Sequence, residues 1–423
     1  MRLLLKNGHL VDPIGKKDGL YDILIEDDKV VKVQTRISDR VDKLIDASDC
    51  LVMPGLIDMH THVREPGYTE KETFVTAGRA AVKGGFTTIC AAPDTKPVID
   101  TSFLVGDIRR QAENESLANV LPVGALSTGL KGKQGADLEG MAREGAVAFS
   151  DETHSLVDMY LLRQLFLRCA RLGLPVFSWN EDRRLSGKGV MNAGKFSKSM
   201  GLAGIPGSAE ETVQARYMLL AEECGCQLHL QHMSTRKSVL MLWLAKKQFE
   251  AVTGEVCPHH LFLTEECLME KGAAGKVYPP LRTEEDRLAL IDGLRDGIID
   301  VIATDHSPHE AGKWTLEEAP SGFSGLETAL PLVYTGLVKQ GLLSASQMVE
   351  KMSSNPARIL KINRGSLNPG DIADITVFDP RPEYDISTEG FASLGKNTPF
   401  EGYHVSGRVT TTLVSGRVVY RNN

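Results

Sequence analysis

Hydrophobic and polar positions alternate differently in the middle and at the ends of this chain. In the middle, short apolar runs that fit buried strands are followed by polar loops and amphipathic stretches of helical period. Eight such runs lie at residues 56–59, 87–91, 120–125, 146–149, 175–178, 227–231, 250–255 and 300–303. Helical stretches lie between them, at 73–83, 156–172, 209–223, 236–247 and 284–296. Eight alternating units predict an α/β fold of the (β/α)8 (TIM) barrel type. An open doubly wound sheet is the alternative, but no G-x-G-x-x-G motif follows the first strand.

Both ends of the chain instead carry short β-like runs separated by turn signals. The runs lie at 3–5, 21–26, 29–34 and 44–46, and again at 374–378, 404–406, 410–414 and 417–420. Turn dipeptides such as Asn7-Gly8 and Ser415-Gly416 separate them. Two ends of the same character predict one small β-sandwich domain, residues 1–53 plus 364–423, beside a barrel domain of residues 54–363. A chain of 423 residues is long enough for both.

Composition and charge narrow the classes of function. Charged residues make up 24% and hydrophobic residues 42% of the chain, as in soluble globular proteins. The net charge is −7 and no Lys/Arg-rich tract occurs, so no nucleic-acid partner is expected. No apolar run reaches membrane-spanning length, and the first residues show no signal-peptide pattern. With seven scattered cysteines expected to be reduced thiols, these features predict a cytoplasmic protein without a membrane partner.

Side chains that can bind metal gather at the carboxyl ends of the predicted strands, where barrel enzymes carry their chemistry. His60 and His62 are two positions apart, and strand side chains alternate, so both imidazoles point the same way. Asp151 and Asp305 follow the fourth and eighth strands. We expect these four residues to hold one divalent cation. Asp151 can also bridge to a second cation held partly by His232.

The same residue types predict a class of reaction. A cation in a His/Asp site lowers the pKa of water and polarises a carbonyl group. Asp305, beside the cation, can take a proton from the water and pass it to a leaving nitrogen. Arg64, just beyond the first strand, can hold a carboxylate in bidentate fashion. These roles predict metal-assisted hydrolysis or cyclisation of an amide in a small-molecule substrate.

The motifs that carry these residues resemble the signatures of one enzyme family. Residues 54–67, P-G-L-I-D-M-H-T-H-V-R-E-P-G, resemble the opening signature of the dihydroorotases of the amidohydrolase superfamily. Residues 304–309, T-D-H-S-P-H, resemble the closing signature. Between them lie, in the expected order, F-S-D-E at 149–152, Q-H-M-S-T at 231–235, P-H-H-L at 258–261, P-P-L-R at 279–282 and G-L-E-T at 325–328. The similarity covers essentially the whole chain, and Asp151 stands where some relatives carry a carbamylated lysine.

The resemblance implies a reaction and a set of site residues. The reaction is the reversible interconversion of N-carbamoyl-L-aspartate and L-dihydroorotate in pyrimidine synthesis, with zinc as the metal and Asp305 as the acid/base. The implied metal ligands are His60, His62, Asp151, Asp305 and, for a second ion, His232. The implied substrate contacts are His62, Arg64, Asp94, Tyr278, His309 and Gly322. Residues 307–324 would form a mobile lid, and the enzyme is expected to be a homodimer.

Three positions depart from the family pattern. Trp179 stands where the family has a histidine after the fifth strand, and an indole nitrogen is only a donor, so it cannot bind a metal. Asp94 and Tyr278 each stand where the family has an asparagine near the substrate. We therefore expect one tightly bound zinc and a doubtful second site.

Three functions stay open from the sequence. The first is an active dihydroorotase that uses one cation. The second is a related cyclic amidase of the hydantoinase or allantoinase type, favoured by the negative charge of Asp94. The third is a weakly active relative that associates with aspartate transcarbamoylase. The four predicted ligands argue against the third, because carboxylates buried together are costly without a cation.

Overall fold

The protein is built around the predicted barrel. A computed structural model describes residues 1–310 and 312–422. Eight parallel strands neighbour one another in chain order around the barrel. They are β6 Leu56–Thr61, β7 Phe86–Ala91, β8 Asn119–Ala125, β9 Ala148–Ser150, β10 Val176–Ser178, β13 Leu228–Leu230, β14 Val252–Val256 and β15 Val301–Ile302. A short parallel pair, β11 Met191–Asn192 and β12 Gly204–Ile205, lies outside the barrel sheet. The barrel prediction is confirmed.

Asp58 joins the first and last strands of the barrel. Its Oδ1 accepts a hydrogen bond from the backbone N of Thr304 at 2.9 Å, and its Oδ2 accepts one from Oγ1 of Thr61 at 2.7 Å. Beside it, the backbone N of His62 donates to the carbonyl of His306 at 2.8 Å. The ends of β6 and β15 are thereby held side by side, and these ends carry the candidate metal ligands.

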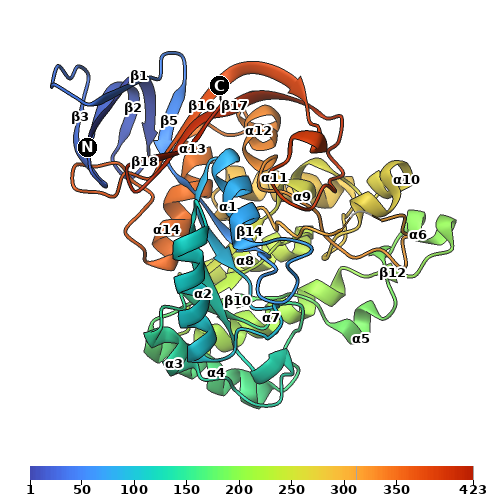
Figure 1. Cartoon of the computed structure of the whole chain (residues 1–423). Coiled ribbons are helices and arrows are strands. Elements are labelled where there is room, and N and C mark those ends of the chain that lie inside the picture. Colours follow the sequence, from blue (N-terminus) through green and yellow to red (C-terminus); the bar gives the residue numbers. More distant parts are fainter. Residues whose placement is uncertain (311, 423) are drawn as a thin grey trace.

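Helices cover the outside of the barrel (Figure 1). Four predicted helices agree with the structure to within one residue at each end: α1 Phe74–Lys83, α7 Ser208–Cys224, α8 Arg236–Lys246 and α11 Glu284–Arg295. The fifth, α4 Met159–Leu172, begins three residues later than predicted, because Asp158 caps it by accepting from the backbone N of Tyr160 and Leu161. The other helices are α2 Ser102–Glu115, α3 Leu138–Arg143, α5 Arg183–Ser186, α6 Lys195–Met200, α9 Pro258–Phe262, α10 Cys267–Lys271, α12 Ala329–Val333, α13 Ala345–Val349 and α14 Asn355–Leu360.

The two ends of the chain form one mixed sheet of eight strands. Its strands are β1 Arg2–Asp12, β2 Lys17–Glu26, β3 Lys29–Gln34, β4 Lys43–Asp46, β5 Leu51–Pro54, β16 Ile375–Asp385, β17 His404–Val414 and β18 Arg417–Arg421. The ends meet where β5 pairs antiparallel with β16. Ile375, Val377 and Leu413 pack with Leu3, Leu5 and Ile23 in a core of their own. A terminal β-domain made from both ends is thus confirmed, and two predicted runs, 404–406 and 410–414, are one strand, β17.

The division into residues 1–53 plus 364–423 and residues 54–363 stays a prediction. It is consistent with the strands, since β5 ends at Pro54 in the terminal sheet and β6 begins the barrel at Leu56. Within residues 1–310 and 312–422, no helix is both long and apolar enough to span a membrane.

Candidate metal centre and active site

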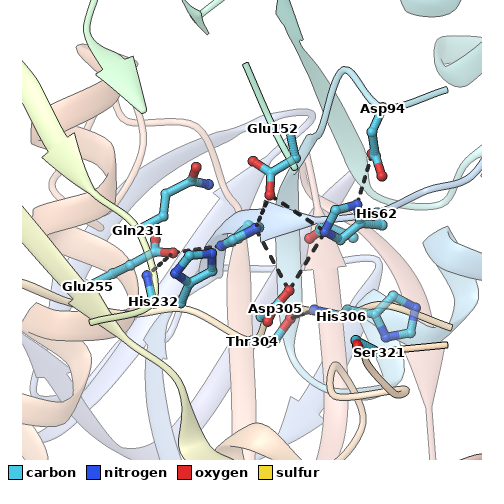
Figure 2. A network of polar contacts seen from close by, with 12 residues as sticks. His62, Asp94, Glu152, Gln231, His232, Glu255, Thr304, Asp305, His306 and Ser321 are labelled. Carbon is cyan, nitrogen blue, oxygen red and sulfur yellow. Dashed lines mark hydrogen bonds and ion pairs between the residues drawn. The ribbon is translucent and has the colours of Figure 1, made fainter. Parts of the chain in front are cut away.

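Four side chains converge at the carboxyl end of the barrel. His60 lies in β6, His62 directly follows it, Glu152 follows β9 and Asp305 follows β15. Nε2 of His60 lies 3.2 Å from Oε1 of Glu152 and 3.7 Å from Oδ1 of Asp305. Nε2 of His62 lies 4.0 Å and 3.7 Å from the same two oxygens (Figure 2). Ligands that share one ion at about 2 Å lie about 3–4 Å from one another. His60, His62 and Asp305 therefore fit one divalent cation, and Glu152, within 4.0 Å of both imidazoles, lies close enough to be a fourth ligand. We call these four buried side chains the ring of ligands.

Asp151 does not join this ring. Its carboxylate accepts hydrogen bonds from the backbone N of Ser127, at 2.8 Å, and from Oγ of the same serine. The carboxylate that faces the imidazoles belongs to the neighbouring Glu152, so the ligand set that we propose has Glu152 in place of Asp151. The physical reason is that β9 ends at Ser150. The next residues are no longer held to strand alternation, so the pattern cannot tell which of two adjacent acids faces the barrel axis.

A second layer of polar side chains orients His60. Its Nδ1–H donates to Oε1 of Glu255 at 2.8 Å, which leaves Nε2 free to face the other ligands. Oε2 of Glu255 accepts from Nε2 of His229 at 3.0 Å, and Nδ1 of His229 pairs with Oγ1 of Thr253 at 2.8 Å. Although burial opposes its ionisation, the histidine partners hold the pKa of Glu255 below its ordinary value. The sequence placed Glu255 at a strand end but missed His229, whose only signal is a polar residue between two leucines of a strand.

His232, the predicted ligand of a second cation, lies beside this ring. His60, Glu152 and His232 each offer a ligand atom within 4.8 Å of the others. Both ring nitrogens of His232 are buried and have no hydrogen-bond partner among the described residues. The indole of Trp179 packs edge-on against its ring, with centroids 4.7 Å apart. A second ion here would have Glu152 and His232 but no donor from Trp179, so the residues fit one cation well and a second one incompletely.

A cavity of about 410 Å³ opens beside the ring of ligands. Asp305 lines it together with all six predicted substrate contacts: His62, Arg64, Asp94, Tyr278, His309 and Gly322. Arg183 lines the same cavity and was missed by the sequence analysis. A larger groove of about 1,060 Å³ lies between α2 and the terminal sheet, and none of the candidate site residues lines it. The structure therefore brings the predicted substrate residues to the metal ring, although their roles stay predictions.

Asp94 pairs with two of its neighbours in this cavity. Its Oδ1 lies 2.8 Å from Nδ1 of His62, and its Oδ2 accepts from Nη1 of Arg64 at 3.1 Å. Burial opposes ionisation of Asp94, but His62 and Arg64 outweigh it and lower the pKa below its ordinary value. Asp94 therefore stays ionised and offsets part of the positive charge that Arg64 offers to a substrate.

The other predicted substrate residues already have backbone partners. Tyr278 Oη donates to the carbonyl of Gly189 and His309 Nε2–H donates to that of Ser321, both at 2.8 Å. Gly322 has a φ of +109°, and a Cβ there would lie 2.4 Å from Cβ of Ser307, so the position requires glycine. Residue 311 of the predicted lid, 307–324, lies outside the described residues, and the mobility of the lid stays a prediction.

Burial shifts the pKa values of Asp305 and His309, which both follow β15 and line the cavity. Burial raises the pKa of Asp305 to about 6, against the opposing pull of His60 and His62. Burial also lowers the pKa of His309 to about 3, and the charge of Arg64 adds to the effect. Burial therefore makes Asp305 easier to protonate than an ordinary carboxyl group, and it keeps His309 a neutral hydrogen-bonding group.

His306 has a structural role at the same strand end. Its Nε2 lies 3.2 Å from Oε2 of the buried Glu72, and its Nδ1 accepts from the backbone N of Gly325 at 3.1 Å. Both ring nitrogens are thus occupied away from the metal ring. All seven cysteines are buried and unpaired, as expected for reduced thiols.

Comparison with known proteins identifies relatives over the full length of the chain. A "Dihydro-orotase-like" family model matches residues 49–238, and an "Amidohydrolase family" model matches residues 228–419. Dihydroorotase of Pelotomaculum thermopropionicum is 44% identical over 100% of this chain and 99% of its own. Dihydroorotase of Syntrophus aciditrophicus is 42% identical over the whole of both chains. The solved L-hydantoinase (dihydropyrimidinase) from Arthrobacter aurescens is 28% identical, with a TM-score of 0.90 over 99% of this chain and 96% of its own.

The barrel, the terminal β-domain and the His/carboxylate ring together define a metal-dependent cyclic amidohydrolase. Within that class, the full-length relatives that are 40–44% identical to this chain are dihydroorotases. It belongs to the dihydroorotase family.

Proposed function

We propose that this enzyme interconverts N-carbamoyl-L-aspartate and L-dihydroorotate, with Asp305 as the acid/base. The observation that carries the proposal is the buried ring of His60, His62, Glu152 and Asp305 at the edge of a cavity lined by a guanidinium. The full-length dihydroorotase relatives favour this substrate pair over other cyclic amides.

The residues of the chain divide the work of the reaction. A divalent cation held by the ring supplies Lewis acidity toward a carbonyl oxygen and lowers the pKa of water. In the hydrolytic direction, Asp305 accepts a proton from water while the water oxygen bonds to the amide carbon of the substrate. Asp305 then delivers that proton to the amide nitrogen of the cyclic substrate as the C–N bond breaks. The reverse order of the same steps closes the ring.

Arg64 and His309 hold the substrate in this proposal. Arg64 enters the cavity from the loop after β6, and its guanidinium matches the geometry of a carboxylate. His309, kept neutral by burial, adds a hydrogen bond without adding charge. Tyr278 and the close-packed backbone at Gly322 line the same cavity. In this proposal, the negative charge of Asp94 reduces the attraction of Arg64 for the substrate carboxylate.

The metal content of the proposed enzyme is one tightly held zinc per chain. Two histidines and two carboxylates in an approximately four-coordinate arrangement suit zinc, although cobalt and manganese accept the same donors. The site between Glu152 and His232 would be weak, because Trp179 gives it no third ligand. Elemental analysis of protein purified without chelator tests both statements.

A hydantoinase-type amidase is the second candidate. The specific observation that favours it is the pairing of Asp94 with Arg64, which weakens the site for a carboxylate. The close structural likeness to the Arthrobacter aurescens L-hydantoinase (dihydropyrimidinase) is consistent with it. Hydantoins and dihydropyrimidines without a carboxylate would be the substrates of such an enzyme.

One assay separates these candidates. The purified metal-loaded protein is mixed with L-dihydroorotate, N-carbamoyl-L-aspartate, hydantoin or dihydrouracil, and ring opening or closure is followed by ultraviolet absorbance. We expect turnover of the first two and little of the others. Turnover of only hydantoin or dihydrouracil would favour the second candidate, and no turnover of any would favour a non-catalytic relative.

The assembly and location of the enzyme are proposals from the sequence. A homodimer in the cytoplasm is the expected state, and association with aspartate transcarbamoylase is the role left for a weakly active relative. Analytical ultracentrifugation of the protein, alone and mixed with aspartate transcarbamoylase, measures both associations.

A further inference from the structure

His259 is a buried histidine that neither the sequence analysis nor the proposed mechanism uses. It lies in the short helix α9, directly after β14, and is 1% exposed. Neither of its ring nitrogens has a hydrogen-bond partner within the described part of the chain. Buried polar groups are nearly always paired, because an unpaired one destabilises the folded state. The position of this imidazole therefore calls for a functional explanation.

The nearest carboxylate oxygen to this imidazole belongs to the proposed acid/base. Nε2 of His259 lies 4.0 Å from Oδ2 of Asp305. The other oxygen of Asp305, Oδ1, faces His60 and His62 at 3.7 Å each. The two oxygens of one carboxylate thus have different neighbours, with the metal ligands on one side and a single neutral imidazole on the other.

Packing fixes the ring of His259 in this orientation. Phe323 contacts it edge-on with ring centroids 5.2 Å apart, and His260 lies on another side at 4.3 Å. The backbone carbonyl of Phe323 accepts from the N of Ser307 at 2.8 Å, which ties this residue to the loop after β15. Asp305 itself is held at a φ of +50°, where non-glycine residues are uncommon. Neither partner has much freedom to turn away.

We propose that His259 is a positioning residue for Asp305, with its Nε2–H donating to Oδ2 in the metal-loaded enzyme. That hydrogen bond fixes the plane of the carboxylate, so that Oδ1 stays directed at the ring of ligands. Closing the present 4.0 Å to an ordinary hydrogen bond requires a movement of about 1 Å. The proposal rests on the acid/base role given above to Asp305, since a carboxylate that moves protons in two directions must keep its orientation.

A different role for the same residue is metal binding. Cys257, His259 and His260 each offer a ligand atom within 4.8 Å of the others. Nε2 of His260 donates to the carbonyl of Pro279 at 3.0 Å, so only its Nδ1 is left to bind a cation. The contact with Asp305 needs no further group to explain His259, and the two roles predict different metal contents.

Two substitutions test the proposal in the full-length, metal-loaded protein. His259→Leu keeps the bulk and removes the donor, whereas His259→Gln keeps an N–H at similar reach. We expect His259→Leu to lower kcat about 100-fold, with KM and metal per chain unchanged. His259→Gln should restore most of the loss. Crystal structures of the metal-loaded wild type and His259→Leu should show Oδ2 within hydrogen-bond distance of Nε2 in the former and a rotated carboxylate in the latter.

Each contrary result points to a different failure. The positioning role is wrong if His259→Leu has the same kcat as the wild type. It is also wrong if both variants lose kcat equally and both have a lower Tm, because that result indicates a structural role. Loss of metal from both variants assigns His259 to a metal site instead. If the wild type turns over none of the cyclic amides, the proposed function fails. In that case only the crystal structures test the positioning role. A distance of 4.0 Å or more between Nε2 of His259 and Oδ2 of Asp305 in the metal-loaded wild type overturns the proposal.

Discussion

The indole of Trp179 packs edge-on against the imidazole of His232, with ring centroids 4.7 Å apart. Both residues lie at ends of neighbouring strands, β10 and β13, so their side chains share the space next to Glu152. His232 keeps two nitrogens without hydrogen-bond partners in the described structure. We expect this pair of residues to decide how many ions the site holds.

Trp179→His should raise the metal content from one ion per chain to two. The new imidazole would add a donor beside Glu152 and His232, completing a set of three protein ligands. Elemental analysis after dialysis against zinc and removal of loosely bound ions measures the change. Trp179→Phe is the matched control, because it also removes the indole but adds no ligand, and it should stay at one ion. Two ions in the wild type would show that Trp179 does not block the second site.

Glu152→Gln should bind its metal more weakly than the wild type, whereas Asp151→Asn should bind it as tightly. The carboxylate of Glu152 faces the imidazoles of the ring, and that of Asp151 is hydrogen-bonded to Ser127. The two substitutions change charge and shape equally and lie one residue apart, so each is the control for the other. Metal per chain after passage over a chelating resin gives the answer. The opposite ranking would restore Asp151 as the ligand.

Asp151 and Glu152 show which features the sequence could predict and which it could not. The eight strands and the strand-end cluster could be predicted, because apolar runs and a period of two depend only on local burial. The choice between Asp151 and Glu152 could not, since β9 stops at Ser150 and the loop beyond it follows no period. The layer formed by His229 and Glu255 depends on which strands are neighbours, and only the closed barrel sets that. His259 lies in the P-H-H-L motif at 258–261, but its role could not be predicted, because its neighbour Asp305 is 46 positions away along the chain.

Asp94→Asn should lower the KM for N-carbamoyl-L-aspartate about fivefold. An amide keeps a hydrogen-bonding group near Arg64 but removes a negative charge that repels the substrate carboxylate, which is equivalent to roughly 1 kcal/mol. Steady-state kinetics measure KM. Dihydrouracil, which carries no carboxylate, is the matched control substrate, and any KM for it should not change. An equal change for both compounds would show that Asp94 acts on the shape of the site and not through its charge.

Asp305→Asn should abolish turnover while most of the metal stays bound. An amide oxygen can still bind a cation weakly, but it cannot accept and return a proton, so kcat should fall at least about 1,000-fold. Turnover of L-dihydroorotate and metal per chain are measured on the same preparation. Asp158→Asn, at the N-cap of α4, is a remote control for the same chemical change, because asparagine caps a helix as well as aspartate does. Unchanged turnover in Asp305→Asn would remove this residue from the acid/base role.

Stability between pH 4 and 6.5 should depend on His260. Burial lowers its pKa to about 4, below the value of about 6.5 in the unfolded chain, and the positive charge of Arg282 adds to the effect. The folded state favours the neutral imidazole. The contribution of His260 to stability is therefore fully present above pH 6.5 and is lost as the pH falls toward 4. Over that window the unfolded chain binds the extra proton, and linkage gives a loss of roughly 3 kcal/mol.

His260→Gln should therefore make the free energy of unfolding less dependent on pH. Urea titrations at pH 4.5, 5.5 and 7 compare the variant with the wild type. His404→Gln is the control, because His404 is exposed and Asp385 raises its pKa, so its contribution has the opposite sign and is lost as the pH rises. If the wild type and His260→Gln lose stability equally on acidification, the buried imidazole stays paired when protonated, and the explanation from its burial is wrong.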